Sequence, residues 1–107
     1  MSKLSLKHSL KALSEDNALF RTLFTHGSLE IELYKPVGAD HQKPHERDEI
    51  YVIASGNSHF TLENDAYDVV AGDVLFVAAG LEHRFSDFSS DFSTWVFFYG
   101  PKGGEVS

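Results

Sequence analysis

The clearest pattern in this chain is the alternation of apolar and polar residues. Between residues 29 and 34, three aliphatic side chains alternate with Glu30, Glu32 and Tyr34. A period of two indicates a strand that is buried on one face. Further short segments of strand character lie at residues 50–54, 59–63, 67–70, 74–78, 83–88 and 93–99.

Turn-forming residues separate these segments, as at Gly56-Asn57, Asn64-Asp65 and Gly72-Asp73. Glycine, asparagine and aspartate are the residue types that tight turns require. Many short strands with frequent turns predict an all-β barrel or sandwich, and we expect an antiparallel β-barrel that spans about residues 18–100.

The two ends of the chain have other patterns. Leu6, Leu10 and Leu13 follow helical spacing, which predicts a short helix that covers one end of the domain. The glycine-rich stretch 100–104 predicts a loose tail.

Size and composition fit a single domain over residues 1–107. An apolar content of 42% and an aromatic content of 13% are typical of a folded chain, and nine phenylalanines can fill one small core.

Charge and composition exclude several classes of partner. The formal net charge is −7 and the basic residues are scattered, so we expect no nucleic-acid partner. No segment approaches the ~20 apolar residues of a membrane span, so we expect no membrane partner and a cytoplasmic location. Cysteine is absent, so any metal must be held by nitrogen and oxygen.

Two motifs carry the candidate chemistry. In the first, three residues separate His45 from Glu49, and six separate Glu49 from Gly56. In the second, Gly72 precedes the run Ala78-Ala79-Gly80, which is followed by His83 and Asp87.

This pair of motifs resembles the two-part signature of the cupin family of metal-binding barrels, over about residues 38–87. The resemblance implies a small single-domain cupin of the bacterial type, folded as a double-stranded β-helix or jelly roll with a short N-terminal helical or extended segment. It also implies a divalent metal at His45, Glu49 and His83.

The chain departs from the family pattern at three positions. Lys43 stands where the family has a first histidine, Ala78 stands in place of a proline, and Asp87 in place of an asparagine. The stretch 40–49 nevertheless resembles a subgroup of small cupins with Gln-x-Pro-His followed by Asp-Glu, in which the missing histidine is a variant of the site.

Elementary coordination chemistry supports the same residues. Two imidazoles and one carboxylate form an open set of ligands for a divalent transition metal such as iron, manganese, nickel or zinc. In an extended chain, His41 shares the parity of His45 and is a candidate fourth ligand; Gln42 is a weaker candidate.

Parity also predicts the surroundings of this centre. Tyr51 and Ile53 share the parity of Glu49, and Phe85 shares that of His83. We expect these three side chains to form an apolar substrate pocket around the polar centre.

Three functions fit these observations. The first is a metal-dependent enzyme acting on a small organic molecule, by resemblance a dioxygenase, or else an isomerase or lyase. The second is a non-catalytic metal or small-molecule sensor. The third is a metal-free barrel in which Lys43 pairs with Glu49. We also expect a homodimer, formed through a sheet edge with strand 29–33 and the phenylalanine-rich end of the chain.

Overall fold

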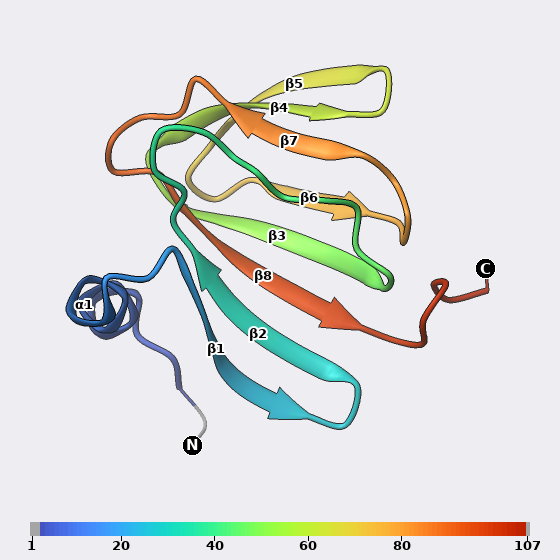
Figure 1. Cartoon of the computed structure of the whole chain (residues 1–107), viewed down its shortest axis with the longest axis horizontal. Helices are drawn as coiled ribbons and strands as arrows, with labels where there is room; N and C mark the ends of the chain where they lie inside the picture. The colour runs from blue at the N-terminus through green and yellow to red at the C-terminus, as the bar shows by residue number, and fades with distance from the viewer. Residues whose placement is uncertain (1–2, 107) are drawn as a thin grey trace.

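One helix and eight strands make up the computed structural model, which describes residues 3–106 (Figure 1). The elements in chain order are α1 (Leu6–Asp16), β1 (Phe20–His26), β2 (Leu29–Tyr34), β3 (Asp48–Ser55), β4 (Asn57–Leu62), β5 (Asp65–Val70), β6 (Val74–Val77), β7 (His83–Ser86) and β8 (Ser93–Tyr99).

The strands form two antiparallel sheets with the order β1-β2-β8-β3-β6 and β5-β4-β7. Both sheets contribute to a single core of buried side chains, namely Tyr34, Tyr51, Ile53, Phe60, Val69, Val77, Phe85, Phe92 and Val96. The prediction of an all-β, antiparallel fold with a short N-terminal helix is confirmed. The hydrogen-bonded ladders divide into two facing sheets, as in a jelly roll, and do not close into one ring.

Strand β1 was not among the predicted segments. It pairs with β2 at the edge of the large sheet, and its ladder has an irregularity between Thr22 and Phe24. Most of its residues are exposed, so the sequence lacks the alternation that marks a half-buried strand.

The helix is confirmed at the predicted leucines. Ser5 caps its start by accepting a hydrogen bond from the His8 amide, and Asn17 ends it in the left-handed conformation. Leu13 is buried on the inner face, and α1 contacts β1. Between residues 3 and 106, no helix has the length and apolar character that crossing a membrane requires.

The predicted dimer edge has to be revised. Strand β2 lies between β1 and β8 inside the large sheet, so it presents no free edge. Exposed apolar side chains lie instead on the edge strands β6 and β5, at Val74, Phe76 and Val70. A homodimer stays a prediction, now moved to these edges.

The segment between β2 and β3 links the two sheets. Asp40 in this segment accepts a hydrogen bond from the Tyr34 hydroxyl of the large sheet and from the Phe85 amide of the small sheet. These contacts set the path of the chain as it approaches β3.

The C-terminal tail is not loose. The Gly103 amide donates to the Glu46 carbonyl, and the Glu105 amide donates to the Asp48 carboxylate. The sequence prediction missed these bonds because they join segments more than fifty residues apart. The tail therefore braces the segment that leads into β3.

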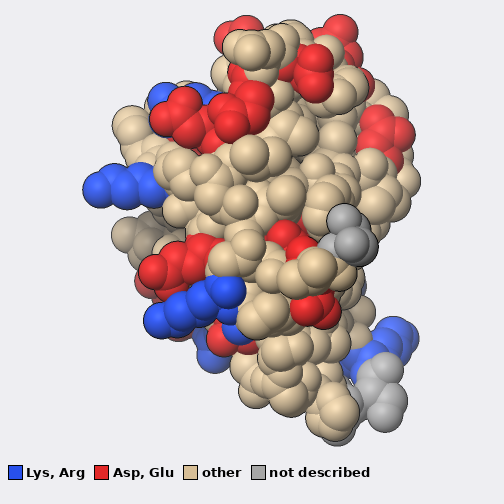
Figure 2. Space-filling view, turned by 90° about the vertical axis from the view of Figure 1, so that its right-hand side faces the viewer, with Lys and Arg blue, Asp and Glu red and all other residues tan. Residues whose placement is uncertain are grey.

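The acidic balance of the chain is visible on its surface. Figure 2 shows the face on the right-hand side of Figure 1, where acidic side chains gather over the upper half. The basic side chains lie mainly toward the left and lower edges of this view.

Candidate metal centre

Three predicted ligands come together at one point between the sheets. The Nδ1 atom of His45 lies 3.0 Å from Glu49 Oε1, and the Nε2 atom of His83 lies 3.1 Å from the same oxygen. One ligand atom from each residue lies within 4.8 Å of the other two. Glu49 lies near the start of β3, His45 precedes that strand, and His83 starts β7, so both sheets contribute.

The hydrogen bonding of His83 prepares it as a ligand. Its Nδ1 atom lies 3.0 Å from the Leu81 carbonyl oxygen, which can accept a hydrogen bond but cannot donate one. The proton of the neutral ring is therefore assigned to Nδ1, and Nε2 faces Glu49 with a lone pair. This is the second-sphere arrangement that orients metal-bound histidines.

His45 has a different environment. Its hydrogen bond with Glu49 raises the pKa of His45, and this effect outweighs burial, which lowers it. The negative charges of Glu49, Glu32 and Asp40 act in the same direction as the hydrogen bond. The His45 side chain is 31% exposed, whereas that of Glu49 is 1% exposed.

Two buried polar atoms at this centre have no hydrogen-bond partner. These atoms are His83 Nε2 and Glu49 Oε2. Leaving such atoms buried and unpaired costs about 1–3 kcal/mol each. A divalent cation would satisfy both, so the residues present fit a metal of the nitrogen- and oxygen-binding kind.

The structure separates the other candidates from this group. His41 is exposed and does not belong to the set of converging ligand atoms, so a fourth ligand at this position is kept only as the alternative to a three-residue set. Lys43 is exposed as well, and Glu49 pairs with the two histidines instead. Among residues 3–106 there is no Lys43–Glu49 salt bridge, which is the ion pair that the metal-free alternative requires.

The residues expected to form the pocket lie in the core. Tyr51, Ile53 and Phe85 are at most 2% exposed and belong to the buried cluster between the sheets. Tyr51 packs near His83, with 5.9 Å between ring centroids. Their inward parity was correct, but it buries them beneath the metal centre and leaves the open cavity to other residues.

Gln42 is held firmly at the rim of the centre. Its amide nitrogen donates to Asp40 at 3.0 Å, and its side-chain oxygen accepts from the Tyr51 hydroxyl at 3.2 Å. Burial raises the pKa of Tyr51 well above its usual value, so this hydroxyl keeps its proton and remains a donor. Both ends of the Gln42 amide are thus occupied.

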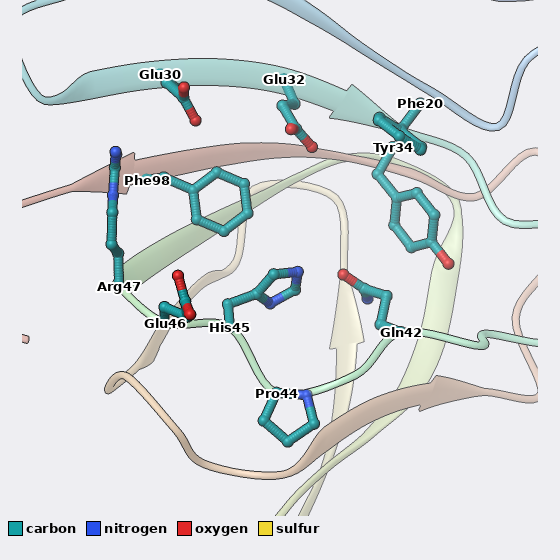
Figure 3. A pocket seen from close by; sticks show the side chains of 10 residues that line it. All are labelled: Phe20, Glu30, Glu32, Tyr34, Gln42, Pro44, His45, Glu46, Arg47 and Phe98. Atoms are coloured by element: carbon teal, nitrogen blue, oxygen red, sulfur yellow. The ribbon is translucent and has the colours of Figure 1, made fainter. Parts of the chain in front are cut away.

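An open cavity of about 460 Å³ lies beside His45 (Figure 3). Its walls come from β1, β2, β8 and the segment before β3, through Phe20, Glu30, Glu32, Tyr34, Gln42, Pro44, His45, Glu46, Arg47 and Phe98. Burial raises the pKa of Glu32 above its ordinary value, which is a frequent property of carboxyls in functional sites.

Sequence reasoning missed most of these wall residues. The alternation in strand 29–34 shows that Glu30, Glu32 and Tyr34 share one face. The alternation does not show that this face lines a cavity, because that depends on the pairing of β2 with β8. The sequence contained one partial indication of this cavity. Tyr34 is a large aromatic residue that shares the parity of the two glutamates, and it is buried in the structure.

A second hollow of about 330 Å³ reaches the centre from the small sheet. It is lined by Gln42, Pro44, Thr61, Glu63, Glu82, His83 and Arg84. Gln42 and Pro44 border both spaces. The metal centre thus lies between two solvent-facing hollows, divided by the segment before β3.

The chain belongs to the cupin family. The family model for the cupin domain matches residues 30–97, which include all three converging ligands and seven of the eight strands, in whole or in large part. The resemblance seen in the two sequence motifs is therefore confirmed.

The chain is also similar in sequence to a bacterial protein. An uncharacterized protein of Streptomyces coelicolor, SCO3923, is 38% identical over 63 residues, which are 59% of this chain and 60% of that protein. The match thus spans less than two thirds of the relative's length.

Solved structures show the same fold. An RmlC-like cupin with a double-stranded β-helix fold from Methanocaldococcus jannaschii has a TM-score of 0.65 and 15% identity, covering 75% of this chain and 77% of that one. A cupin superfamily protein from Desulfitobacterium hafniense has a TM-score of 0.64 and 23% identity, covering 76% and 75%.

Proposed function

We propose that this protein binds one divalent transition metal at His45, Glu49 and His83 and acts on a small organic molecule in the cavity beside His45. The observation that carries the proposal is the convergence of three ligand atoms, with two buried polar atoms that lack a hydrogen-bond partner. A metal-dependent dioxygenase is the reaction class that we favour, followed by an isomerase or a lyase.

A bound ion would supply Lewis acidity and, in the case of iron or manganese, redox chemistry. The chain's own residues would do the rest. The Leu81 carbonyl orients His83, and the Glu49 carboxylate brings a negative charge that strengthens cation binding. His45 lies at the boundary between the centre and the cavity, where it would hold the ion and border a bound organic molecule.

The cavity provides groups that can bind and orient a substrate. Phe98 packs against His45, with 5.0 Å between ring centroids, and excludes water from that side of the imidazole. Glu32 points into the same space (Figure 3), and its raised pKa suits a group that exchanges a proton with a bound molecule.

Metal analysis tests the binding step. Protein purified without chelators or a histidine tag should contain about one metal ion per chain, measured by elemental mass spectrometry. His83→Ala should abolish stoichiometric metal, whereas His59→Ala should keep it, because His59 lies elsewhere and pairs with Asp68. Metal retained in the His83 variant would exclude this assignment.

Oxygen uptake tests turnover. The metal-loaded protein is offered a panel of diketones, catechols, thiols and amines in an oxygen electrode. Consumption that depends on His83 supports the dioxygenase. Stoichiometric metal with no consumption and no product would point to the non-catalytic binding role.

A further inference from the structure

We infer that the cavity beside His45 selects a small molecule with a protonated amine, and that Glu30 and Glu32 determine this specificity. The inference deepens the proposed function and rests on it, because it names the class of substrate for the same site. Its support comes from the charge, the aromatic walls and the unpaired carboxylates of the cavity.

The charge of the cavity wall is predominantly negative. Three carboxylates line it, those of Glu30, Glu32 and Glu46. Glu46 pairs with Lys102 at 3.7 Å, so the carboxylates of Glu30 and Glu32 stand against the single guanidinium of Arg47. One terminal nitrogen of the Arg47 guanidinium donates to the Ser28 carbonyl, whereas its buried Nε has no hydrogen-bond partner. Arg47 keeps its charge, so the two carboxylates outweigh it by one negative charge. The wall therefore repels carboxylates and phosphates, and it attracts cations.

Glu30 and Glu32 lack compensating partners. Within residues 3–106, neither carboxylate has a basic side chain within 4.0 Å. Glu32 accepts a side-chain hydrogen bond from Thr22 at 3.5 Å, the limit of such a bond. Figure 3 shows both carboxylates reaching from β2 toward the space around His45. A cationic ligand would supply the partner that they lack.

Aromatic rings complete the surroundings that an ammonium group favours. Phe20, Tyr34 and Phe98 line the same space as the two carboxylates. A cation over an aromatic face gains about 0.5–2 kcal/mol, and the gain is larger where water is excluded. Anions obtain no such gain from the ring faces.

The position of the cavity defines a ligand with two different ends. At one end, His45 borders the metal centre, where an ion would outweigh the single charge of Glu49 and attract a donor atom. At the other wall, Glu30 and Glu32 favour the amine. A molecule with a donor group at one end and an ammonium group at the other fits both.

Two probes of equal chain length test the charge preference. Butylammonium and butyrate are titrated into the full chain, with and without zinc, and binding is followed by amide chemical shifts. In the zinc-free sample we expect the wild type to bind butylammonium at least about tenfold more tightly, since hydrogen bonds to charged groups contribute about 1.5–3 kcal/mol. With zinc bound, the carboxylate of butyrate can also reach the ion, so that sample should show a smaller preference.

Matched variants assign the preference to its residues. The double variant E30Q/E32Q keeps shape and size, and it should reduce the preference to less than about twofold. E15Q, on the exposed face of α1, should leave the preference unchanged. Circular dichroism and zinc content are measured on every sample to show that the fold and the metal centre persist.

The outcomes separate the inference from the proposed function. In the zinc-free sample, equal affinity for the probes, tighter binding of butyrate, or a preference that survives E30Q/E32Q would overturn the inference. A preference for butylammonium without stoichiometric metal would overturn the proposed metal function and leave the charge selection standing. Metal binding together with a preference that E30Q/E32Q removes supports both.

Discussion

The Nδ1 atom of His83 lies 3.0 Å from the carbonyl oxygen of Leu81 and thereby determines which ring nitrogen faces Glu49. The neutral ring should carry its proton on Nδ1, and Nε2 should be free to accept a metal. Nitrogen-15 chemical shifts of the metal-free protein at pH 8 should therefore report an unprotonated Nε2. Added zinc should shift that resonance, and a proton on Nε2 in the metal-free state would contradict the arrangement.

His41 should be dispensable for metal binding. Its side chain is exposed and lies outside the group of converging atoms, so His41→Ala should leave zinc affinity within about twofold. His45→Ala, made in parallel, should weaken zinc binding by orders of magnitude, because a three-ligand set loses one of its members. Calorimetric titration measures both affinities, and a large loss in the His41 variant would restore it as a fourth ligand.

Asp40 should contribute strongly to stability. It is 2% exposed and accepts hydrogen bonds from the Tyr34 hydroxyl, the Phe85 amide, and both the backbone and side-chain nitrogens of Gln42. Asp40→Ala leaves these donors without an acceptor and should lower the free energy of unfolding by roughly 3–5 kcal/mol.

Urea denaturation measures the effect of Asp40→Ala. Asp65→Asn is the control, since Asp65 is exposed at the start of β5, and it should change stability by less than about 0.5 kcal/mol. Equal effects of the two substitutions would show that Asp40 has no special role.

Two buried tyrosines should make the fold sensitive to alkali. Burial raises the pKa values of Tyr34 and Tyr51 above the usual 10, and the hydrogen bond with Asp40 raises that of Tyr34 further. Both side chains therefore stay protonated in the folded state at a pH at which the unfolded chain releases the protons. Their contribution to stability is complete below about pH 10 and is lost as pH rises toward the folded pKa values.

Tyr34→Phe should reduce the slope of unfolding free energy against pH above pH 10 by about 1.4 kcal/mol per pH unit, the value for one proton. The slope comes from urea denaturation at several pH values, and tyrosinate absorbance reports ionisation. An unchanged slope, or ionisation of Tyr34 in the folded state, would exclude this account.

Gly56 should tolerate no side chain. Its φ is 72°, and an added Cβ would lie 2.4 Å from Ser89 Oγ and 2.7 Å from the Phe92 Cα atom. Gly72 also has a positive φ, 97°, but a Cβ there would meet no atom within 4 Å.

A comparison of alanine substitutions at Gly56 and Gly72 separates the cost of backbone strain from the cost of steric conflict. Gly72→Ala should cost about 1–2 kcal/mol from the left-handed backbone alone. Gly56→Ala should cost about 1–3 kcal/mol more, because the backbone of Phe92 cannot move away easily. Thermal denaturation of the two variants measures the difference, and equal losses would mean that the contacts around Gly56 can relax.

Local patterns predicted much of this fold. Strand β8 was predicted at its observed bounds, Ser93–Tyr99, and α1 was predicted from three leucines, because alternation and helical spacing are properties of neighbouring residues. Strand β1 was missed because an exposed edge strand has no need to alternate. The tail was predicted as loose because its partners, Glu46 and Asp48, are distant in sequence.

The residues of the candidate metal centre were also predictable from the sequence. The spacing of His45, Glu49 and His83 relative to the glycines follows a family pattern, so a resemblance in sequence was enough to group the three residues. The cavity was not predictable in this way. Parity shows that Glu30 and Glu32 share a face, whereas the pairing of β2 with β8 decides what that face encloses.

The position of β8 has a consequence for how the chain folds. It is synthesised after the seven other strands that the structure describes, yet it lies in the middle of the large sheet, where it pairs with β2 on one side and β3 on the other. Until the ribosome has released residues 93–99, β2 and β3 have no partner on their facing edges. The large sheet can therefore form only after residues 93–99 have been translated, through distant contacts of the kind that slow folding. During that interval the exposed strand edges would be open to chaperones or to pairing with other chains.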